Sequence, residues 1–533
     1  MVTESQQIRA LMERNLALET LEESDRVWDV LVIGGGASGL GAAVESATRG
    51  YTTLLLEQDD FAKGTSSRST KLIHGGVRYL AQGNIALVME ALRERGLLKR
   101  NAPHLVKDQS FVIPCYKWWC VPFYTVGLTL YDLLAGKLGV GRSVPLSKTQ
   151  TLKSLPDARK SGLRGGVRYH DCQFDDARLA INLCQTLFEQ GGYALNYMPV
   201  TGILKNEGKV NGVMAEDLEN GRKYGIRARV VVNATGVFVD RIIRMAEPGA
   251  RDVVKPSQGI HLVVDRSFLS GREALMIPKT SDGRVLFAVP WHGRVVIGTT
   301  DVEKQEAELE PRAEETEVDY ILETAGRFLD RAPGRDDILS IFTGLRPLAA
   351  PAGRGKKTKE ISRGHRILVS PSGLVTLTGG KWTTYRKMGE DVIDKAAERA
   401  GLPGRPSVTR DQKIHGYRQV TDMSEINYWY GKDLEQIKAI VKEDRENGQM
   451  ISKMLQITRA QVIWAVRGEM ARSVEDFLSR RSRALQLDAA ESVRMAPAVA
   501  RIMAGELERD SKWETGQVNA FTTLASKYMI NSL

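Results

Sequence analysis

Three glycines near the start of the chain have the spacing of a phosphate-binding turn. Gly34, Gly36 and Gly39 form the pattern G-x-G-x-x-G, which follows the apolar run WDVLVI and leads into LGAAVESATRG. In such a turn the first glycine permits a tight bend, the second lets backbone approach a pyrophosphate, and the third lets strand and helix pack closely. Free N–H groups at the start of the helix then face the anion. The pattern predicts a dinucleotide-binding site.

An acidic residue follows at the position that contacts a ribose in such sites. Glu57 ends the second apolar run, YTTLLLE. Its carboxylate can accept hydrogen bonds from a ribose diol and would repel a 2′-phosphate. NAD and FAD fit this spacing equally well, so these residues leave the choice of dinucleotide open.

Two later segments favour FAD. The segment NATG at 233–236 follows the apolar run ARVVV, and its small residues would let backbone come close to a dinucleotide. The segment GGK at 379–381 follows LVTLT and precedes a helical pattern, whose N-terminus suits the polar end of a flavin ring. Because these segments lie far apart in the sequence, we expect an extended cofactor threaded through the domain, which FAD fits better than NAD.

The elements that must position these motifs combine parallel and antiparallel strands with helices. The stretch 28–57 has the pattern of one βαβ unit. A β-rich block covers 194–236, and another at 253–301 has a hairpin turn at His292-Gly293. After Gly401 the segment LPGRPSV breaks helix, and the rest is mostly helical in pattern. The expected fold class is α/β, with a discontinuous FAD-binding Rossmann-like domain, an antiparallel-sheet substrate domain and a C-terminal helical domain.

The 533 residues are too many for a single hydrophobic core, so we expect several domains. The predicted division is an N-terminal extension at 1–25, an FAD-binding domain at 26–110, 165–250 and 340–403, a substrate- or membrane-facing domain at 111–164 and 251–339, and a helical domain at 404–533. The extension is either an amphipathic helix packed on the body or on a partner, or a frayed end. The helical tail either caps the body or pairs two copies, so the sequence does not decide whether the protein forms a homodimer.

Charge and cysteine content narrow the classes of partner. The net charge of +10 favours anionic partners such as phosphates, acidic lipid or nucleic acid. The chain lacks the basic stripe interleaved with aromatics that nucleic-acid binding needs, so no nucleic-acid partner is expected. The four cysteines include no C-x-x-C pair, which predicts reduced thiols and no metal site. Residues 1–25 lack the apolar core of a secretory leader, so a secreted product is not expected.

Several motifs carry a more specific resemblance. From about residue 26 to 400 the chain resembles the FAD-dependent glycerol-3-phosphate dehydrogenases, above all their mitochondrial-type branch. The motifs are GTSSRSTKLIHGGVRYL at 64–80, YKWW at 116–119, SDGRV at 281–285, GTTD at 298–301, LRPL at 345–348 and GGKWTTYR at 379–386. Val237 stands where the family often has proline, and the tail has no D-x-D-x-D-G loop, which argues against calcium control.

Basic residues and two histidines are the candidates for the chemistry. Arg78, Arg346 and Lys381 lie among small or apolar neighbours, a setting that suits a dianionic phosphate. The resemblance implies that Arg78, Tyr79 and Arg346 line the substrate pocket. It also implies that His261 lies over the flavin, as the base for a hydroxyl proton or as a hydrogen-bond donor. Catalysis is therefore assigned to His261 and Arg346, and substrate binding to these two with Arg78, Tyr79 and Lys381.

His74 is the competing candidate for the base, although its position among flavin-loop residues indicates cofactor contact. The expected cofactor-binding residues come from the glycine turn, the 64–80 motif and the two later segments. They are Gly34, Gly36, Gly39, Glu57, Ser66, Ser67, Thr70, Lys71, Leu72, His74, Ala234, Gly236, Gly380, Lys381 and Thr383.

The resemblance implies oxidation of sn-glycerol 3-phosphate to dihydroxyacetone phosphate in glycerol catabolism. The hydride would pass to the flavin and the electrons to a membrane quinone, with the protein on the cytoplasmic side of a cell membrane or on the mitochondrial inner membrane. The segment KWWCVPFYTVGLTLYDLLAGK at 117–137 is apolar and aromatic with basic ends. It is either an interfacial membrane segment or a buried connector. The sequence does not decide between quinone and oxygen as the electron acceptor.

Three other functions fit the same sequence features. A flavin oxidase of an amine or a 2-hydroxy acid would use Arg346 to bind a carboxylate. A flavin-dependent tRNA-modifying protein is suggested only by the basic charge. A flavoprotein that keeps the fold as a structural subunit would show no turnover.

Overall fold

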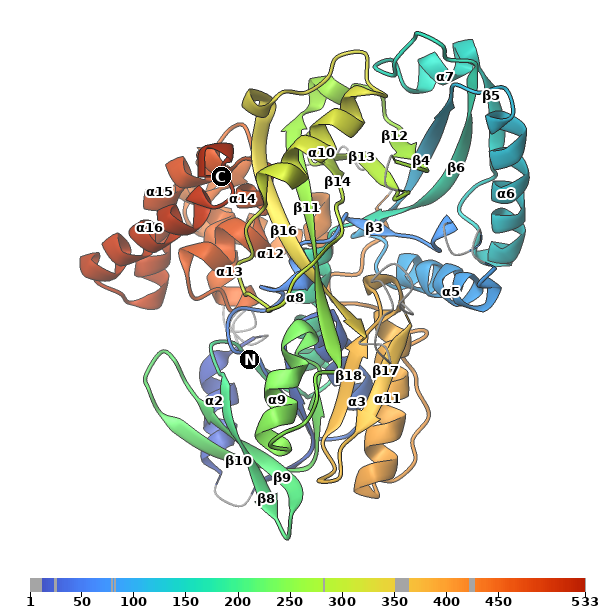
Figure 1. The fold of residues 1–533 in the computed structure, drawn as a ribbon. Helices are drawn as coiled ribbons and strands as arrows, with labels where there is room; N and C mark the ends of the chain where they lie inside the picture. Colours follow the sequence, from blue (N-terminus) through green and yellow to red (C-terminus); the bar gives the residue numbers. More distant parts are fainter. Residues whose placement is uncertain are drawn as a thin grey trace.

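The computed structural model describes residues 12–23, 26–77, 80, 83–280, 283–349, 364–420 and 427–532. Two large sheets, one of eight strands and one of ten, form the lower and upper parts of the molecule in Figure 1. A cluster of C-terminal helices lies beside them. The fold class predicted from the sequence is confirmed.

The first sheet contains the predicted βαβ unit. Its strands run in the order β17-β18-β10-β1-β2-β7. Their bounds are Val27–Ile33 for β1, Thr53–Leu56 for β2, Tyr193–Leu195 for β7, Lys223–Asn233 for β10, His365–Val369 for β17 and Val375–Gly379 for β18. Strand β1 pairs in parallel with both β2 and β10. Val30, Leu31 and Val32 are fully buried, as expected for a parallel strand covered on both faces.

Helices α3 (Ala37–Thr48) and α11 (Tyr385–Ala400) pack closely on the first sheet. A side-chain carbon on Gly41 would lie 2.7 Å from the carbonyl oxygen of Tyr385, and one on Gly389 would lie 2.5 Å from that of Gly41. Glycine on both helices therefore permits this crossing, which holds the glycine turn against the 379–384 segment.

Further elements extend this half of the molecule. Strands β8 (Val200–Asn206) and β9 (Lys209–Glu216) form an antiparallel hairpin that pairs with β10. Helix α9 covers Val239–Ala246. In the predicted N-terminal extension, helix α2 (Arg14–Glu22) packs on the body, because Ala17 is buried in the core and Arg14 forms a buried ion pair with Asp217. Of that extension, residues 1–11, 24 and 25 lie outside the described residues.

The second sheet is mostly antiparallel, with the order β15-β11-β14-β13-β12-β4-β6-β3 and with β16 and β5 paired to β11 and β6. The strand bounds are Leu72–Ile73 for β3, Val106–Cys115 for β4, Val144–Ser147 for β5, Gly165–Phe174 for β6, Val254–Asp265 for β11, Ala274–Ile277 for β12, Leu286–Trp291 for β13, Arg294–Gly298 for β14, Val302–Glu303 for β15 and Ile338–Ala349 for β16. The predicted hairpin turn is confirmed, since His292 and Gly293 both have positive φ between β13 and β14.

Four strands pair differently from the predicted domain division. All of β3 and β6, the first half of β4 and most of β16 lie in the ranges predicted for the FAD-binding domain, yet all four strands belong to the second sheet. All ten residues of β6 pair with β4, and β16 pairs along almost the whole of β11. Hydrophobic periodicity predicts that a segment is a strand but not which distant strand it pairs with. The division into domains itself stays a prediction.

The helical tail predicted after Gly401 is confirmed. Helix α11 ends at Ala400, and Gly401 takes the left-handed conformation that ends many helices. The tail contains α12 (Leu434–Glu443), α13 (Arg459–Glu469), α14 (Ala484–Leu487), α15 (Ala489–Leu507), α16 (Ser511–Ser526) and a small hairpin of β19 (Met450–Ser452) and β20 (Ile457–Thr458). Buried ion pairs from Asp60 to Arg480 and Arg481 join the tail to the loop that follows β2.

Five more helices are α5 (Ile85–Asn101), α6 (Cys120–Ala135), α7 (Lys148–Ser154), α8 (Asp176–Glu189) and α10 (Glu315–Gly326). Helices α6, α7 and α10 contact strands of the second sheet, whereas α8 contacts α3 and β7 of the other half. Helix α6 accounts for most of the 117–137 segment. It buries Leu128 and Tyr131 but exposes a row of apolar side chains, so the segment is not a buried connector.

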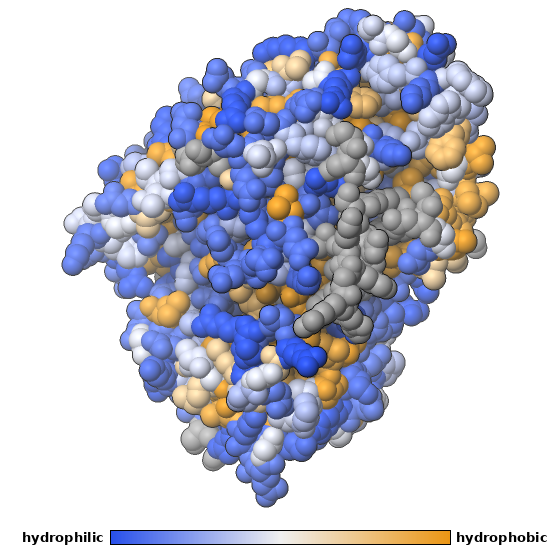
Figure 2. All heavy atoms as spheres, viewed as in Figure 1, coloured by the Kyte–Doolittle hydropathy of each residue, from blue (hydrophilic) through white to orange (hydrophobic). Residues whose placement is uncertain are grey.

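Figure 2 shows hydrophobic residues gathered at the edge where α6 lies in Figure 1. Within the described ranges, no helix is long and apolar enough to cross a membrane.

Candidate functional site

Four neighbouring parallel strands of the first sheet end at one cavity. Gly34 follows β1, Glu57 follows β2, Ala234 follows β10 and Gly380 follows β18, and all four residues line the cavity. Its volume is about 440 Å³, and one face of the second sheet closes its other side. Ligands of open α/β sheets bind outside the carboxyl ends of the strands, which is where this cavity lies.

The glycine turn has the geometry that the sequence predicts. Gly34 has a φ of 111°, and a side-chain carbon there would lie 2.8 Å from the carbonyl oxygen of Ala234. A side-chain carbon on Gly39 would lie 1.8 Å from the carbonyl oxygen of Gly34. Gly39 therefore allows the close packing of strand and helix, while Gly34 and Gly36 line the cavity at the start of α3.

Glu57 lies at the cavity edge beside this turn. Its carboxylate accepts hydrogen bonds from the backbone N–H groups of Gly35, at 2.6 Å, and Asp59, at 3.0 Å. Burial is the largest effect on this group and raises the pKa of Glu57 to about 7. The carboxylate is therefore positioned by backbone, and its charge changes near neutral pH.

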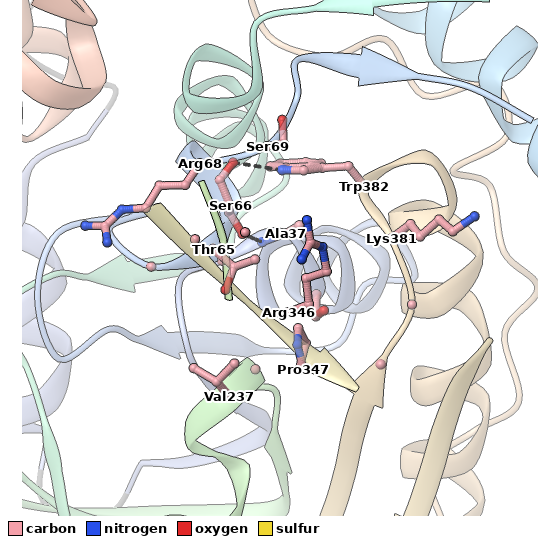
Figure 3. Close-up of a pocket in the computed structure, with 18 of the residues that line it drawn as sticks. Ala37, Thr65, Ser66, Arg68, Ser69, Val237, Arg346, Pro347, Lys381 and Trp382 are labelled. Carbon is pink, nitrogen blue, oxygen red and sulfur yellow. Dashed lines mark hydrogen bonds between the residues drawn. The ribbon is translucent and has the colours of Figure 1, made fainter. Parts of the chain in front are cut away.

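The loop 64–70 joins the glycine turn to the 379–384 segment. The hydroxyl of Ser66 accepts a hydrogen bond from the N–H of Ala37 at 2.9 Å. The indole N–H of Trp382 donates to the carbonyl oxygen of Ser66 at 2.8 Å (Figure 3). Trp382 was not predicted as a site residue, although it belongs to the GGKWTTYR motif. Segments more than three hundred positions apart thus share one wall of the cavity.

Most of the predicted cofactor contacts lie in the cavity wall. The residues that do are Gly34, Gly36, Glu57, Ser66, Thr70, Leu72, His74, Ala234, Gly236, Gly380, Lys381 and Thr383. Arg78 and Tyr79, predicted to bind the substrate, lie outside the described residues.

Gly39, Ser67 and Lys71 lie outside the cavity wall that the described residues form. Ser67 and Lys71 are both buried. The ammonium of Lys71 pairs with Asp176 at 2.8 Å and donates to the carbonyl oxygen of Ser67 at 2.7 Å. A buried charge must be paired, so this side chain faces the carboxylate rather than the cavity.

His261 lies in the cavity wall on β11, where two contacts define its position. Its Nε2 is 2.9 Å from the hydroxyl of Thr70, and its ring stacks on Phe342 with a centroid distance of 4.7 Å. Its Nδ1 is buried and has no hydrogen-bond partner among the described residues. Burial, with Arg346 and Lys71 adding positive charge nearby, holds the pKa of His261 well below its usual value. The imidazole is therefore neutral at neutral pH and able to accept a proton.

Arg346 lines the cavity from the neighbouring strand β16. Its guanidinium donates to the carbonyl oxygen of Gln258 at 3.2 Å, to the hydroxyl of Thr299 at 3.0 Å and to the carbonyl oxygen of Thr300 at 3.1 Å. These contacts fix the orientation of a planar, permanently charged group at the cavity surface. Thr299 was not predicted, although it belongs to the GTTD motif that was noted.

The cavity has the properties that an extended dinucleotide requires. It is lined by the glycine turn and Glu57, by the 234–236 and 379–383 segments, and by His261 and Arg346. Close backbone approaches, together with neutral and cationic side chains, suit a redox cofactor beside an anionic substrate.

Comparison with known proteins identifies the family of this chain. The family described as FAD dependent oxidoreductase matches residues 29–386, and the C-terminal domain of alpha-glycerophosphate oxidase matches residues 375–514. The mitochondrial glycerol-3-phosphate dehydrogenase of Macaca fascicularis is 36% identical over 532 residues, which cover 93% of this chain and 73% of that protein. The corresponding protein of Saccharomyces cerevisiae is 34% identical and matches 91% of this chain and 88% of its own length.

A solved structure agrees with these matches. The glycerol-3-phosphate dehydrogenase from Bacillus halodurans, complexed with FAD, superposes with a TM-score of 0.79 at 30% identity and covers 98% of both chains. The chain therefore belongs to the FAD-dependent oxidoreductases and, within them, to the family of the mitochondrial-type glycerol-3-phosphate dehydrogenases, with FAD as its cofactor.

Proposed function

We propose that the protein oxidises sn-glycerol 3-phosphate to dihydroxyacetone phosphate in glycerol catabolism. The observation that carries this proposal is the placement of His261 and Arg346 on adjacent strands, both in the wall of the cavity that begins at the glycine turn. The relatives named above are glycerol-3-phosphate dehydrogenases, which supports the same substrate. The flavin, when bound, supplies the acceptor for the hydride that leaves the alcohol carbon.

The side chains have separate roles in this proposal. Arg346 and Lys381 bind the phosphate, with Arg78 and Tyr79 as further contacts implied by the resemblance. Arg346 and Lys381 both belong to the cavity wall, and two such cations suit a dianion better than the single carboxylate of an amino acid or a 2-hydroxy acid. His261, which is neutral, accepts the hydroxyl proton. The cavity-lining residues of the glycine turn and the loops 64–74, 234–236 and 379–383 hold FAD.

A substrate panel tests this proposal. With a soluble artificial electron acceptor, glycerol 3-phosphate is expected to turn over at least about a hundredfold faster than glycerol at equal concentration, because glycerol lacks the group that two cations bind. Lactate and a small amine are expected to show no turnover. Faster turnover of either of these two would favour the flavin oxidase of an amine or a 2-hydroxy acid.

Glu57 is expected to make FAD retention depend on pH. Ribose hydroxyls donate to the ionised carboxylate, and its pKa of about 7 means that the charge is lost as the pH falls through neutrality. The Kd for FAD should therefore rise about tenfold from about pH 8 to about pH 6. The fluorescence of free FAD after dilution of the holoenzyme measures this.

Glu57→Gln is expected to raise the Kd about tenfold at about pH 8 and to remove the pH dependence in this range. The exposed Glu19→Gln is the matched control and should behave as the wild type. A pH-independent wild-type Kd would remove Glu57 from the ribose site.

We further propose that the electrons pass to a membrane quinone and that the protein binds a membrane surface through α6. The apolar residues exposed there, called here the α6 face, are Trp118, Trp119, Phe123, Val126, Leu130 and Leu133. From Trp119 onward they recur every three or four positions, so they form one stripe of the helix. Trp118, Val126 and Leu133 are 77%, 73% and 72% exposed. Exposed basic residues, including Lys117 and Arg142, lie near this stripe in the sequence and suit anionic headgroups.

Charged substitutions on the α6 face are expected to release the protein from membranes. Phe123→Glu combined with Val126→Glu places two carboxylates where the apolar stripe would enter the lipid, so co-sedimentation with vesicles of phosphatidylcholine and phosphatidylglycerol should fall about tenfold or more. Leu218→Glu, at an apolar residue that is 56% exposed in another part of the molecule, is the control and should sediment as the wild type. Equal sedimentation of the double variant and the wild type would contradict this role of α6.

A further inference from the structure

The carbonyl oxygens that hold Arg346 come from two separate segments of the second sheet. The guanidinium donates to the carbonyl oxygen of Gln258, on β11, and to that of Thr300, which follows β14. A side-chain carbon on Gly259 would lie 2.2 Å from Nη2 of Arg346, so the guanidinium lies against the backbone of β11. The orientation of Arg346 therefore depends on how the segment that contains Thr300 is held against β11.

The strand ladder is irregular at this point. His261 pairs with Gly298, and Gln258 pairs with Val302. Between these two pairs, the residues 299–301 lie opposite only two residues of β11. An extra residue of this kind interrupts the ladder and changes the direction of the groups beside it. The position of this segment therefore depends on hydrogen bonds from side chains.

The carboxylate of Glu317, on α10, bonds to both segments. Its Oε2 accepts from the side-chain amide of Gln258 at 2.6 Å, and its Oε1 accepts from the hydroxyl of Thr300 at 2.5 Å. That hydroxyl in turn accepts from the N–H of Ile260 at 3.0 Å. One carboxylate thus joins β11 to the interrupted segment, at the two residues whose carbonyl oxygens contact Arg346.

Glu317 lies behind the cavity wall. Helix α10 contacts β11 and β14 in the upper part of the molecule (Figure 1). The side chains of Glu317, Gln258 and Thr300 are buried, and the wall that the described residues form includes only Thr300 of these three. A third donor to the carboxylate is the backbone N–H of Glu314 at 3.2 Å. Because its partners are donors, an amide in place of this carboxylate would turn an NH2 group toward one of them.

Glu317 also lies in the first turn of α10, where a carboxylate stabilises the helix itself. The bond from the N–H of Glu314 belongs to that role. The two shorter bonds leave the helix and end at the residues that hold Arg346. A residue that only capped α10 would affect the stability of the protein, but it would not change the affinity for a substrate.

We propose that Glu317 positions the guanidinium of Arg346 and thereby sets the affinity of the site for the phosphate of the substrate. This inference rests on the proposed function, in which Arg346 binds that phosphate. Glu317 is a positioning residue, because it acts through Gln258 and Thr300. While the two carbonyl oxygens keep their spacing, the planar guanidinium keeps the direction that a phosphate requires.

Glu317→Gln is expected to raise the KM for glycerol 3-phosphate about threefold to tenfold, while kcat stays within about twofold of the wild type. Inorganic phosphate, used as a competitive inhibitor, should lose affinity by a similar factor. A variant that was only less stable would contain less active enzyme, which lowers the apparent kcat and leaves the KM unchanged. Glu314→Gln, at a neighbouring carboxylate that pairs with Lys304, is the control and should match the wild type.

Glu317→Gln combined with Arg346→Ala shows whether the two residues act together. If Glu317 acts through Arg346, the double variant should have the kcat/KM of Arg346→Ala alone, within about twofold. Independent effects would multiply, so a loss equal to the product of the two separate losses would overturn the inference. FAD content and Tm report whether each variant is folded.

Thr300 supplies a second pair of variants, which carries the test if Glu317→Gln does not fold. Thr300→Val removes the hydroxyl that donates to Glu317 and should raise the KM about threefold to tenfold. Thr300→Ser keeps that hydroxyl and should stay within about twofold of the wild type. An unchanged KM in folded Glu317→Gln or in folded Thr300→Val would overturn the positioning role.

A failure of this inference can be told apart from a failure of the proposed function. If Arg346→Ala raises the KM for glycerol 3-phosphate but Glu317→Gln does not, only the positioning role is wrong. If Arg346→Ala leaves the KM unchanged, the assignment of the phosphate to Arg346 is wrong, and the positioning role fails with it. If glycerol 3-phosphate does not reduce the flavin under anaerobic conditions, the proposed function itself is wrong.

Discussion

Arg346→Ala is expected to lower kcat/KM for glycerol 3-phosphate by at least about tenfold while FAD stays bound. Each charge-assisted hydrogen bond to the phosphate contributes about 1.5–3 kcal/mol, and about 1.4 kcal/mol corresponds to a factor of ten. Arg346 lies on β16, whereas the glycine turn and Glu57 follow strands of the first sheet, so FAD binding should survive. Steady-state kinetics and the FAD-to-protein ratio measure the two effects.

Two further variants control this experiment. Arg346→Lys keeps the charge but loses the planar fork, so it should recover only part of the lost kcat/KM. Arg244→Ala removes a surface arginine that pairs with Asp252 and should leave the kinetics unchanged. Unchanged kinetics in Arg346→Ala would remove Arg346 from the substrate site.

Replacing His261 by alanine is expected to slow reduction of the flavin by glycerol 3-phosphate about 10²- to 10⁴-fold, the usual contribution of a positioned general base. The holoenzyme should still contain FAD, because the cofactor contacts proposed above come from other residues. Stopped-flow absorbance measures the rate under anaerobic conditions. A near wild-type rate would make His74, which also lines the cavity, the stronger candidate for the base.

The pH dependence of this rate gives a further test of the same residue. A base must be unprotonated to act, and the pKa of His261 is held well below its usual value by burial and by Arg346. The rate should therefore stay level as the pH falls from about 8 to about 6.5 and decline only at lower pH. Arg346→Ala removes a nearby positive charge, so the decline should begin at higher pH. A decline that begins above about pH 7 in the wild type would contradict a neutral His261.

Local patterns predicted local structure well. The βαβ unit at 28–57 and the hairpin turn at His292-Gly293 follow from residues close in sequence, and both are confirmed. The choice of FAD over NAD rested on segments far apart in the chain that the fold brings to one cavity, and the family confirms it. What the sequence could not provide was strand partnership. Periodicity contains no information about the distant strands to which β6 and β16 bond.

In the predicted site, the direction of each side chain could not be predicted from the motif that contains it. Thr70 and Lys71 are neighbours in one motif, but Thr70 contacts His261 while Lys71 faces Asp176 in the interior. A motif gives the position of a backbone segment, whereas the direction of each side chain depends on partners elsewhere. Trp382 and Thr299 lay in noted motifs and were missed because their roles are hydrogen bonds to distant residues.

The proposed function depends on the delivery of a hydride from glycerol 3-phosphate to the bound flavin. Its most direct test is anaerobic addition of glycerol 3-phosphate to the yellow holoenzyme without any acceptor, followed by absorbance. The flavin is expected to bleach with glycerol 3-phosphate and to keep its colour with glycerol. A flavin that stays oxidised after glycerol 3-phosphate is added would contradict it.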